Sequence, residues 1–170
     1  MLNLFLTSLL ANFGHTPTKN QRKVIGELTD FAFCIPKALG TKHTFVLKGY
    51  AGTGKTSIIG ALVKTLPEFN FTPVLLAPTG RAAKVLSNYS NQPAYTIHKM
   101  IYQIKSGGDG FTRFSIKENK FENALFLVDE ASMIGDGAGL ASAGWGETKS
   151  LLDDLLSYVY SGKNCKLILI

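Results

Sequence analysis

The sequence predicts an α/β fold in which a mainly parallel sheet lies between helices as the middle of three layers. Apolar runs of strand length occur at residues 44–47, 74–77, 124–128 and 166–170. They lack polar alternation, which is typical of strands buried on both faces. Helical patterns separate them, at residues 55–66, 80–88, 96–104 and 150–160. Because strands alternate with helices through long crossovers, we expect a parallel sheet in one domain of 170 residues.

The composition is that of a folded chain with a basic excess. Hydrophobic residues make up 45% and the net charge is +6, which excludes a disordered polyelectrolyte and suits a polyanionic partner. Cys34 and Cys165 lie far apart without metal-ligand spacing, so we expect free thiols in a reducing compartment.

The apolar N-terminus predicts a packing helix. Leu2, Leu6, Leu9, Leu10 and Phe13 fit one helical face. No Lys or Arg precedes Lys19, so the basic region of a signal peptide is missing. No apolar run reaches the roughly 18 residues of a membrane span. We therefore expect a cytoplasmic protein without a membrane partner.

Two glycine-rich segments interrupt the alternation. Residues 106–110 precede an alternating, strand-like run at 111–116. With residues 117–120 as its turn, this run predicts a surface hairpin insert within 106–122. Residues 135–146 contain many small side chains and predict a loop before the helix at Ser150.

The segment Gly49-Tyr50-Ala51-Gly52-Thr53-Gly54-Lys55-Thr56 matches G-x-x-x-x-G-K-[ST] between a predicted strand and a predicted helix. Glycines let successive backbone N–H groups turn inward around an anion, and the helix N-terminus adds positive potential. Lys55 can reach the β- and γ-phosphates, and the Thr56 hydroxyl can ligate Mg²⁺. The motif predicts a P-loop, with nucleotide-binding candidates Gly49, Gly52, Thr53, Gly54, Lys55, Thr56 and Ser57.

Asp129 and Glu130 follow the strand at 124–128. Ligands gather at the carboxyl ends of parallel strands, so we expect this pair to face the P-loop. Asp129 would hold Mg²⁺, through water. Glu130 would orient or deprotonate the attacking water, as a catalytic residue beside Lys55. A carboxylate that activates water, next to the carboxylate that holds the metal, favours an NTPase over a small-molecule kinase, because such a kinase must exclude water.

Read together, these motifs resemble the first RecA-like domain of superfamily 1 DNA helicases of the RecD/Dda-like branch. Residues 76–84 are similar to motif Ia, residues 94–99 to the T-I-H element, residues 128–133 to motif II, and residues 18–22 to the Q motif. The resemblance implies a RecA-like P-loop NTPase that uses ATP and Mg²⁺. It further implies that the strand at 166–170 lies between the P-loop strand and the Asp129 strand.

The resemblance assigns further roles. Within the Q-motif region at 17–34, Gln21 would pair with adenine and select ATP over GTP. Single-stranded DNA would be held by Thr79, Gly80, Arg81, Thr96 and His98. The alternatives are a helix cap for Thr79, a packed residue for His98 and an exposed helical residue for Gln21.

The sequence departs from the family after Ile170, where motif III and a second RecA-like domain would follow. That domain normally supplies an arginine finger, and Arg22, Arg81 and Arg113 lie in other elements. We therefore expect the N-terminal part of a helicase, whose missing second RecA-like domain is a required partner, and little unwinding by this chain alone. The alternative classes are a non-catalytic ATP-binding module and a small-molecule P-loop kinase.

Overall fold

The computed structural model describes residues 1–34, 44–106, 112–135 and 150–170. Its main sheet contains five strands in the order β1-β7-β6-β2-β3, and every pairing is parallel. The strands are β1 (Thr44–Val46), β2 (Thr72–Ala77), β3 (Ala94–Thr96), β6 (Ala124–Val128) and β7 (Lys166–Leu169). The predicted α/β class is confirmed.

The C-terminal strand β7 lies between the P-loop strand and the Asp129 strand, as the resemblance implies. Phe45 of β1 pairs with Ile168, and Leu127 of β6 also pairs with Ile168. All five residues of β6 are buried. β6 is apolar throughout, and β7 is apolar after the buried Lys166, because helices cover both faces of the sheet.

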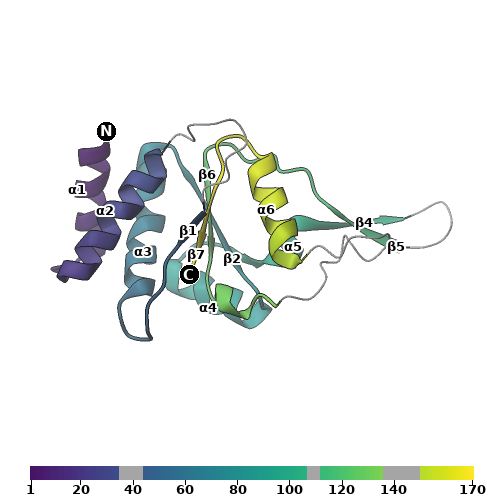
Figure 1. Cartoon of the computed structure of the whole chain (residues 1–170), viewed down its shortest axis with the longest axis horizontal. Helices are drawn as coiled ribbons and strands as arrows, with labels where there is room; N and C mark the ends of the chain where they lie inside the picture. Colours follow the sequence, from purple (N-terminus) through teal and green to yellow (C-terminus); the bar gives the residue numbers. More distant parts are fainter. Residues whose placement is uncertain (35–43, 107–111, 136–149) are drawn as a thin grey trace.

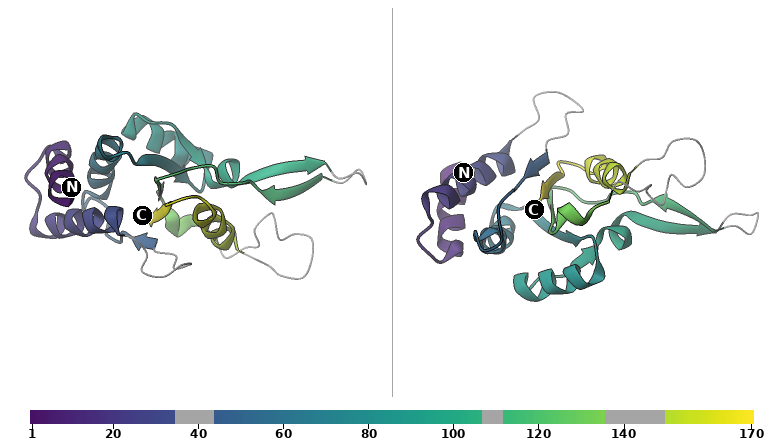
Figure 2. Two further views of the ribbon diagram at one scale, coloured as in Figure 1. Left: turned by 90° about the horizontal axis from the view of Figure 1, so that it is seen from above. Right: turned by 60° about the horizontal axis from the view of Figure 1, so that its bottom comes forward.

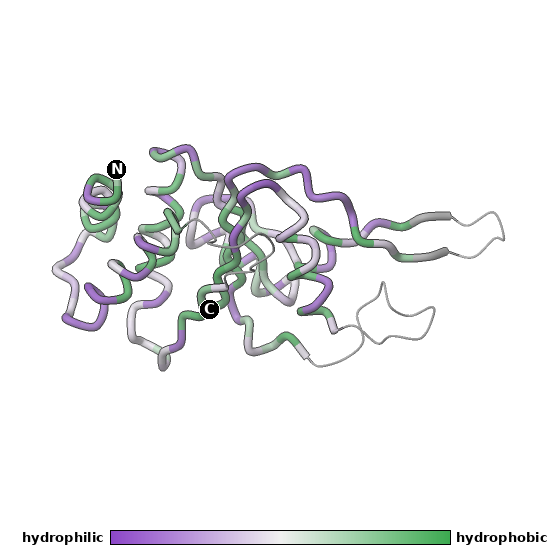
Figure 3. The backbone as a smooth tube through the Cα atoms, turned by 45° about the horizontal axis from the view of Figure 1, so that its top comes forward, coloured by the Kyte–Doolittle hydropathy of each residue, from purple (hydrophilic) through white to green (hydrophobic). Residues whose placement is uncertain are grey.

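Helices form the two outer layers (Figure 1). On one side, α1 (Leu2–Phe13), α2 (Lys19–Phe33) and α3 (Lys55–Thr65) share a core with Leu125 and Leu127, and Leu86 of α4 (Gly80–Ser90) joins it. On the other side, α5 (Ile97–Ile101) and α6 (Leu151–Ser161) pack with Phe126 and Val128. Successive side chains of one strand thus enter different cores. Hydrophobic segments accordingly concentrate at the centre (Figure 3).

The N-terminal packing helix has a slightly different buried face from the predicted one. Phe5, Leu9 and Phe13 are buried, whereas Leu2 is 44% exposed. The spacing of four residues keeps the three buried side chains on one face, and Phe5 packs edge-on against Phe33 of α2. Ser8 and Asn12 also donate hydrogen bonds to Glu68 in the short helix η1 (Leu66–Phe69).

The predicted hairpin is present with different bounds. The strands are β4 (Tyr102–Ser106) and β5 (Thr112–Ile116), which pair antiparallel outside the main sheet. They form an arm that projects from the body (Figures 1 and 2). The helix predicted for 96–104 therefore ends at Ile101, because Tyr102 and Ile104 begin a period-two pattern.

Residues 117–120 are not the turn of this hairpin. They follow β5, and Asn119 is buried. Its amide donates to the carbonyls of Tyr158 and Val159, which satisfies the C-terminal end of α6. Asn119, a polar residue within the predicted turn, is instead buried and caps the C-terminal end of α6. The predicted loop at 135–146 lies, except for Gly135, outside the described residues.

Candidate nucleotide site

The P-loop connects the carboxyl end of β1 to the start of α3. Gly52 and Gly54 have φ values of 77° and 87°, in the left-handed region that glycine occupies without strain. A Cβ atom on Gly49 would lie 2.9 Å from Oγ1 of Thr53. The loop can therefore close around a small anion only with these glycines.

Polar side chains of the loop bond to its own backbone in this structure. The Thr53 hydroxyl donates to the Tyr50 carbonyl at 2.8 Å. The Lys55 ammonium donates to the carbonyls of Gly49 and Tyr50. Lys55 thus lies over the loop, where its charge faces the space enclosed by the backbone.

The two predicted carboxylates lie at the carboxyl end of β6. The Asp129 N–H donates to the Leu76 carbonyl at 3.0 Å, which continues the sheet hydrogen bonding into this residue. Glu130 has φ 55° and ψ 37°, a left-handed conformation that is strained for a residue with a side chain. The next residue is fixed because the Ala131 N–H donates to the Ile170 carbonyl at 2.8 Å. The side chain of Glu130 is exposed.

The P-loop and both carboxylates line one cavity of about 1030 Å³. Every predicted nucleotide-binding residue of the loop, together with Asp129 and Glu130, belongs to its wall. The wall also includes residues that the sequence motifs do not single out as nucleotide contacts, among them Tyr89, Leu169 and Ile170. Tyr89 packs where Gly60 has no side chain, since a Cβ there would lie 3.2 Å from its ring. No sequence signal that we recognise marks Tyr89.

Gln21 lies directly beside the loop. Its Nε2 donates to the Thr53 carbonyl at 3.0 Å, and its Oε1 accepts from the Thr18 N–H at 2.9 Å. The second contact belongs to a capping box at the start of α2, which the spacing Thr18-x-x-Gln21 could have revealed. An amide nitrogen has two hydrogens and an amide oxygen accepts two bonds, so these contacts leave one donor and one acceptor for a pairing with adenine.

The predicted DNA-contacting residues lie at the carboxyl ends of β2 and β3. Thr79 caps α4 by accepting from the Ala82 N–H at 3.2 Å, and Thr96 caps α5 by accepting from the Lys99 N–H at 3.2 Å. The strands carry them side by side, because Ala77 pairs with Thr96. A hydroxyl that accepts in a cap still has its O–H to donate, so capping leaves both groups able to bind a phosphate.

The remaining predicted contacts are near these caps. Gly80 and Arg81 form the exposed first turn of α4. His98 is exposed, and its ring lies 5.7 Å from that of Tyr102. The nucleotide cavity does not include any of these residues, so the structure separates the two groups of candidates. Among the described residues, no helix is long and apolar enough to cross a membrane.

A five-stranded parallel sheet with a glycine loop between β1 and α3 and a carboxylate pair at the end of β6 defines a P-loop nucleotide-binding domain. Residues 34–141 match the family described as "AAA domain". The chain belongs to this family, as a domain of the superfamily 1 RecD/Dda-like type.

Characterised and uncharacterised relatives share parts of the chain. The "ATP-dependent RecD2 DNA helicase" of Deinococcus radiodurans is 32% identical over 96 residues, 56% of this chain and 13% of that protein. The "ATP-dependent DNA helicase dda" of Enterobacteria phage T4 is 39% identical over 61 residues, 35% of this chain and 14% of that protein. "Uncharacterized protein R530" of Acanthamoeba polyphaga mimivirus is 35% identical over 118 residues, 55% of this chain and 24% of that protein. The chain thus matches less than a quarter of each of these three relatives.

Proposed function

We propose that this chain binds Mg²⁺-ATP and hydrolyses it as the N-terminal ATPase domain of an ATP-dependent DNA helicase. The observation that carries the proposal is the shared cavity, whose wall combines a glycine-rich anion loop with two adjacent carboxylates from a neighbouring element. A phosphate cradle facing a metal ligand and a water-activating base is the arrangement that phosphoryl transfer to water requires.

The loop fits a triphosphate. Glycines with positive φ at Gly52 and Gly54 turn backbone N–H groups inward, and α3 starts at Lys55 with its N-terminus toward the loop. Lys55 reaches only backbone carbonyls in the bonds described above. A phosphate oxygen is a stronger, charge-assisted acceptor than a carbonyl, so Lys55 would leave these carbonyls for the nucleotide.

The donor set also fits Mg²⁺. Thr56 and Asp129 line the same cavity from α3 and from the end of β6. The described residues contain no cluster of three or more His, Cys, Asp or Glu side chains. Mg²⁺ does not need such a cluster, because it binds through one or two protein oxygens, substrate phosphates and water. When bound, the ion neutralises charge that develops on the phosphates.

Glu130 is the residue that favours hydrolysis. It follows Asp129 directly, is exposed to the cavity and is held in a fixed backbone conformation. A carboxylate in this position accepts a proton from water or orients it for attack. Gln21 beside Thr53 supports a preference for adenine, since an amide can pair with a base edge through both a donor and an acceptor.

DNA is the polyanion proposed for the second group of residues. Thr79 and Thr96 would donate hydroxyl hydrogens to phosphates, and Arg81 and His98 would add charge or hydrogen bonds beside them. A net charge of +6 supports this partner. We propose that unwinding itself requires a second RecA-like domain. ATP use supports a cytoplasmic location.

Steady-state hydrolysis tests the proposal. We expect the protein to release phosphate from ATP only with Mg²⁺, and single-stranded DNA to raise the rate. Glu130→Gln should bind ATP normally but reduce turnover by at least about 100-fold, whereas Lys55→Ala should lose binding. Glu118→Gln is the matched control, because Glu118 is exposed outside the cavity. Nucleotide binding without Glu130-dependent turnover, even when the second domain is supplied, would instead identify a non-catalytic module.

A further inference from the structure

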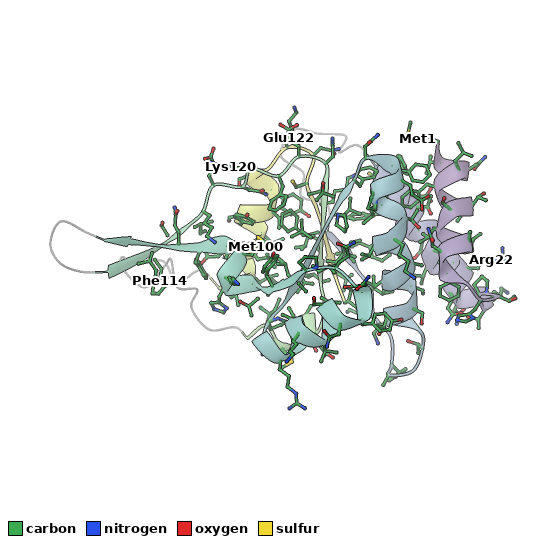
Figure 4. All side chains as sticks on the ribbon, turned by 180° about the vertical axis from the view of Figure 1, so that it is seen from behind. Met1, Arg22, Met100, Phe114, Lys120 and Glu122 are labelled. Carbon is green, nitrogen blue, oxygen red and sulfur yellow. The ribbon has the colours of Figure 1, made fainter. Side chains whose placement is uncertain are left out.

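The projecting arm formed by β4 and β5 is anchored at one end. Its innermost pair joins the body: Tyr102 is buried and the facing Ile116 packs against the same core. The pair two residues farther out, Ile104 and Phe114, is 66% and 41% exposed. Figure 4 shows Phe114 out on the arm, beyond Met100 in the short helix at its base. Among the described residues, the contacts that hold the arm therefore lie at its base.

The base contains a buried hydrogen bond that the proposed ATPase chemistry does not use. The Tyr102 hydroxyl donates to Oδ2 of Asp154 at 2.6 Å. Tyr102 is 6% exposed and Asp154, in the first turn of α6, is 1% exposed. A hydroxyl–carboxylate bond of this length is charge-assisted. Because a buried carboxylate is costly without a partner, the bond strongly favours one orientation of the Tyr102 side chain.

Tyr102 also contacts a residue of the proposed DNA site. Its ring lies 5.7 Å from the ring of His98, inclined by 50°. Neighbouring bonds join the end of β5 to α5, since the Lys117 N–H donates to the Ile101 carbonyl and the Lys117 ammonium to the Lys99 carbonyl, both at 2.7 Å. One tyrosine thus links α6, the arm and His98.

We propose that Tyr102 and Asp154 are positioning residues: their hydrogen bond sets the direction of the β4–β5 arm and the orientation of His98. The DNA-binding consequence rests on the proposed function, whereas the effect on the arm does not. Removal of the hydroxyl leaves the ring, its packing and the Lys117 bonds, but it releases the arm from Asp154 of α6, which widens the range of arm directions and removes a constraint on His98.

A distance measurement without any ligand tests whether the Tyr102–Asp154 bond sets the direction of the arm. Spin labels at Phe114→Cys and Ser157→Cys, in a Cys34→Ser background, would report the separation of the arm from α6 by double electron–electron resonance. We expect a narrow distribution with native Tyr102 and one at least twice as wide with Tyr102→Phe. Tyr160→Phe is the matched control, because it removes a hydroxyl contact between α6 and Thr44 away from the arm. Equal widths for Tyr102→Phe and the control would overturn the proposal.

A second variant guards against loss of the fold. Asp154→Asn keeps the shape and an acceptor but removes the charge, and we expect an intermediate width of the distance distribution.

DNA binding gives the functional readout: the Kd for a fluorescent oligothymidylate should rise at least fivefold in Tyr102→Phe, while the Kd for ATP stays within twofold. A parallel loss of both affinities would indicate general destabilisation and contradict a positioning role. If the native chain binds no DNA, the proposed function fails. The label distances still decide whether the Tyr102–Asp154 bond sets the direction of the arm.

Discussion

The backbone N–H of Glu130 donates a hydrogen bond of 3.0 Å to Oδ1 of Asp129. The metal-ligand candidate therefore fixes the backbone of the catalytic candidate that follows it. Oδ2 of Asp129 takes no part in this bond and would be left for a metal-bound water in the proposed site. The bond also explains how Glu130 is held in its left-handed conformation, together with the contact from Ala131 to Ile170.

Asp129→Asn should separate the electrostatic role of Asp129 from its structural role. The amide oxygen can still accept from the Glu130 N–H, but the negative charge is lost. We expect ATP binding in Mg²⁺ to weaken by about tenfold, close to 1.4 kcal/mol, and binding in EDTA to stay unchanged. Titration with a fluorescent ATP analogue measures both. An equal loss in EDTA would show that the residue does not act through the metal.

Glu130→Gly should stabilise the fold relative to Glu130→Ala. Glu130 adopts φ 55°, and the left-handed region costs a residue with a Cβ about 1–2 kcal/mol compared with glycine. We expect urea unfolding to show a difference of about 1 kcal/mol between the two variants, while neither hydrolyses ATP. Equal stabilities would mean that the strain is absent in solution.

Gln21 variants should change the choice of nucleotide. Gln21→Glu keeps an acceptor for the Thr18 N–H but places a carboxylate oxygen against the Thr53 carbonyl. We expect about a tenfold loss of ATP affinity and a smaller loss for GTP, limited to the effect of the repulsion at Thr53. Lys23→Ala, an exposed change two residues along α2, is the control. A uniform loss for both nucleotides would assign Gln21 to loop structure instead of base recognition.

The buried thiol of Cys165 should make the fold less stable at alkaline pH. Burial raises the pKa of its thiol above the ordinary value of 9.0. A group with a raised folded pKa stabilises the fold fully below the unfolded pKa, and this contribution is lost as pH rises through the folded pKa. We expect the free energy of unfolding to fall above about pH 9, and to fall less steeply in Cys165→Ala.

The slope in Cys165→Ala should not vanish, because burial also raises the pKa values of Tyr158 and Tyr160. Urea unfolding from pH 7 to pH 10 measures both slopes. The variant should be less stable at neutral pH by about 1 kcal/mol, through the lost packing of the sulfur. Identical slopes in the two proteins would exclude Cys165 as a titrating group.

Four strands of the central sheet were predictable because each contains an apolar run, which at 124–128 fills the whole strand. β3 was missed because its three residues, Ala94-Tyr95-Thr96, lie at the sheet edge and carry little apolar signal. The partner strand of the hairpin was read as helix, since local pattern does not specify which distant residues pair. The packing of Tyr89 against Gly60 was not predictable either, because the two residues are far apart in the sequence.

The candidate site was predictable where one continuous motif creates it. Residues 49–56 fold locally into the loop, and Asp129 follows a strand whose end must face it. The contact from Gln21 to Thr53 joins residues 32 positions apart, and it depends on how α2 docks beside the loop. The capping box fixes the Gln21 side chain locally, but only tertiary packing decides what it meets.

Equilibrium binding of ATP to the chain and to its Lys55→Ala variant tests the central claim most directly. The phosphate cradle predicts Mg²⁺-dependent binding of a fluorescent ATP analogue, displaced by unlabelled ATP, and at least about tenfold weaker binding when the ammonium is removed. Lys64→Ala provides an exposed lysine on the same helix as the control. Binding that is absent in the native chain, or equally strong in Lys55→Ala, would contradict the account.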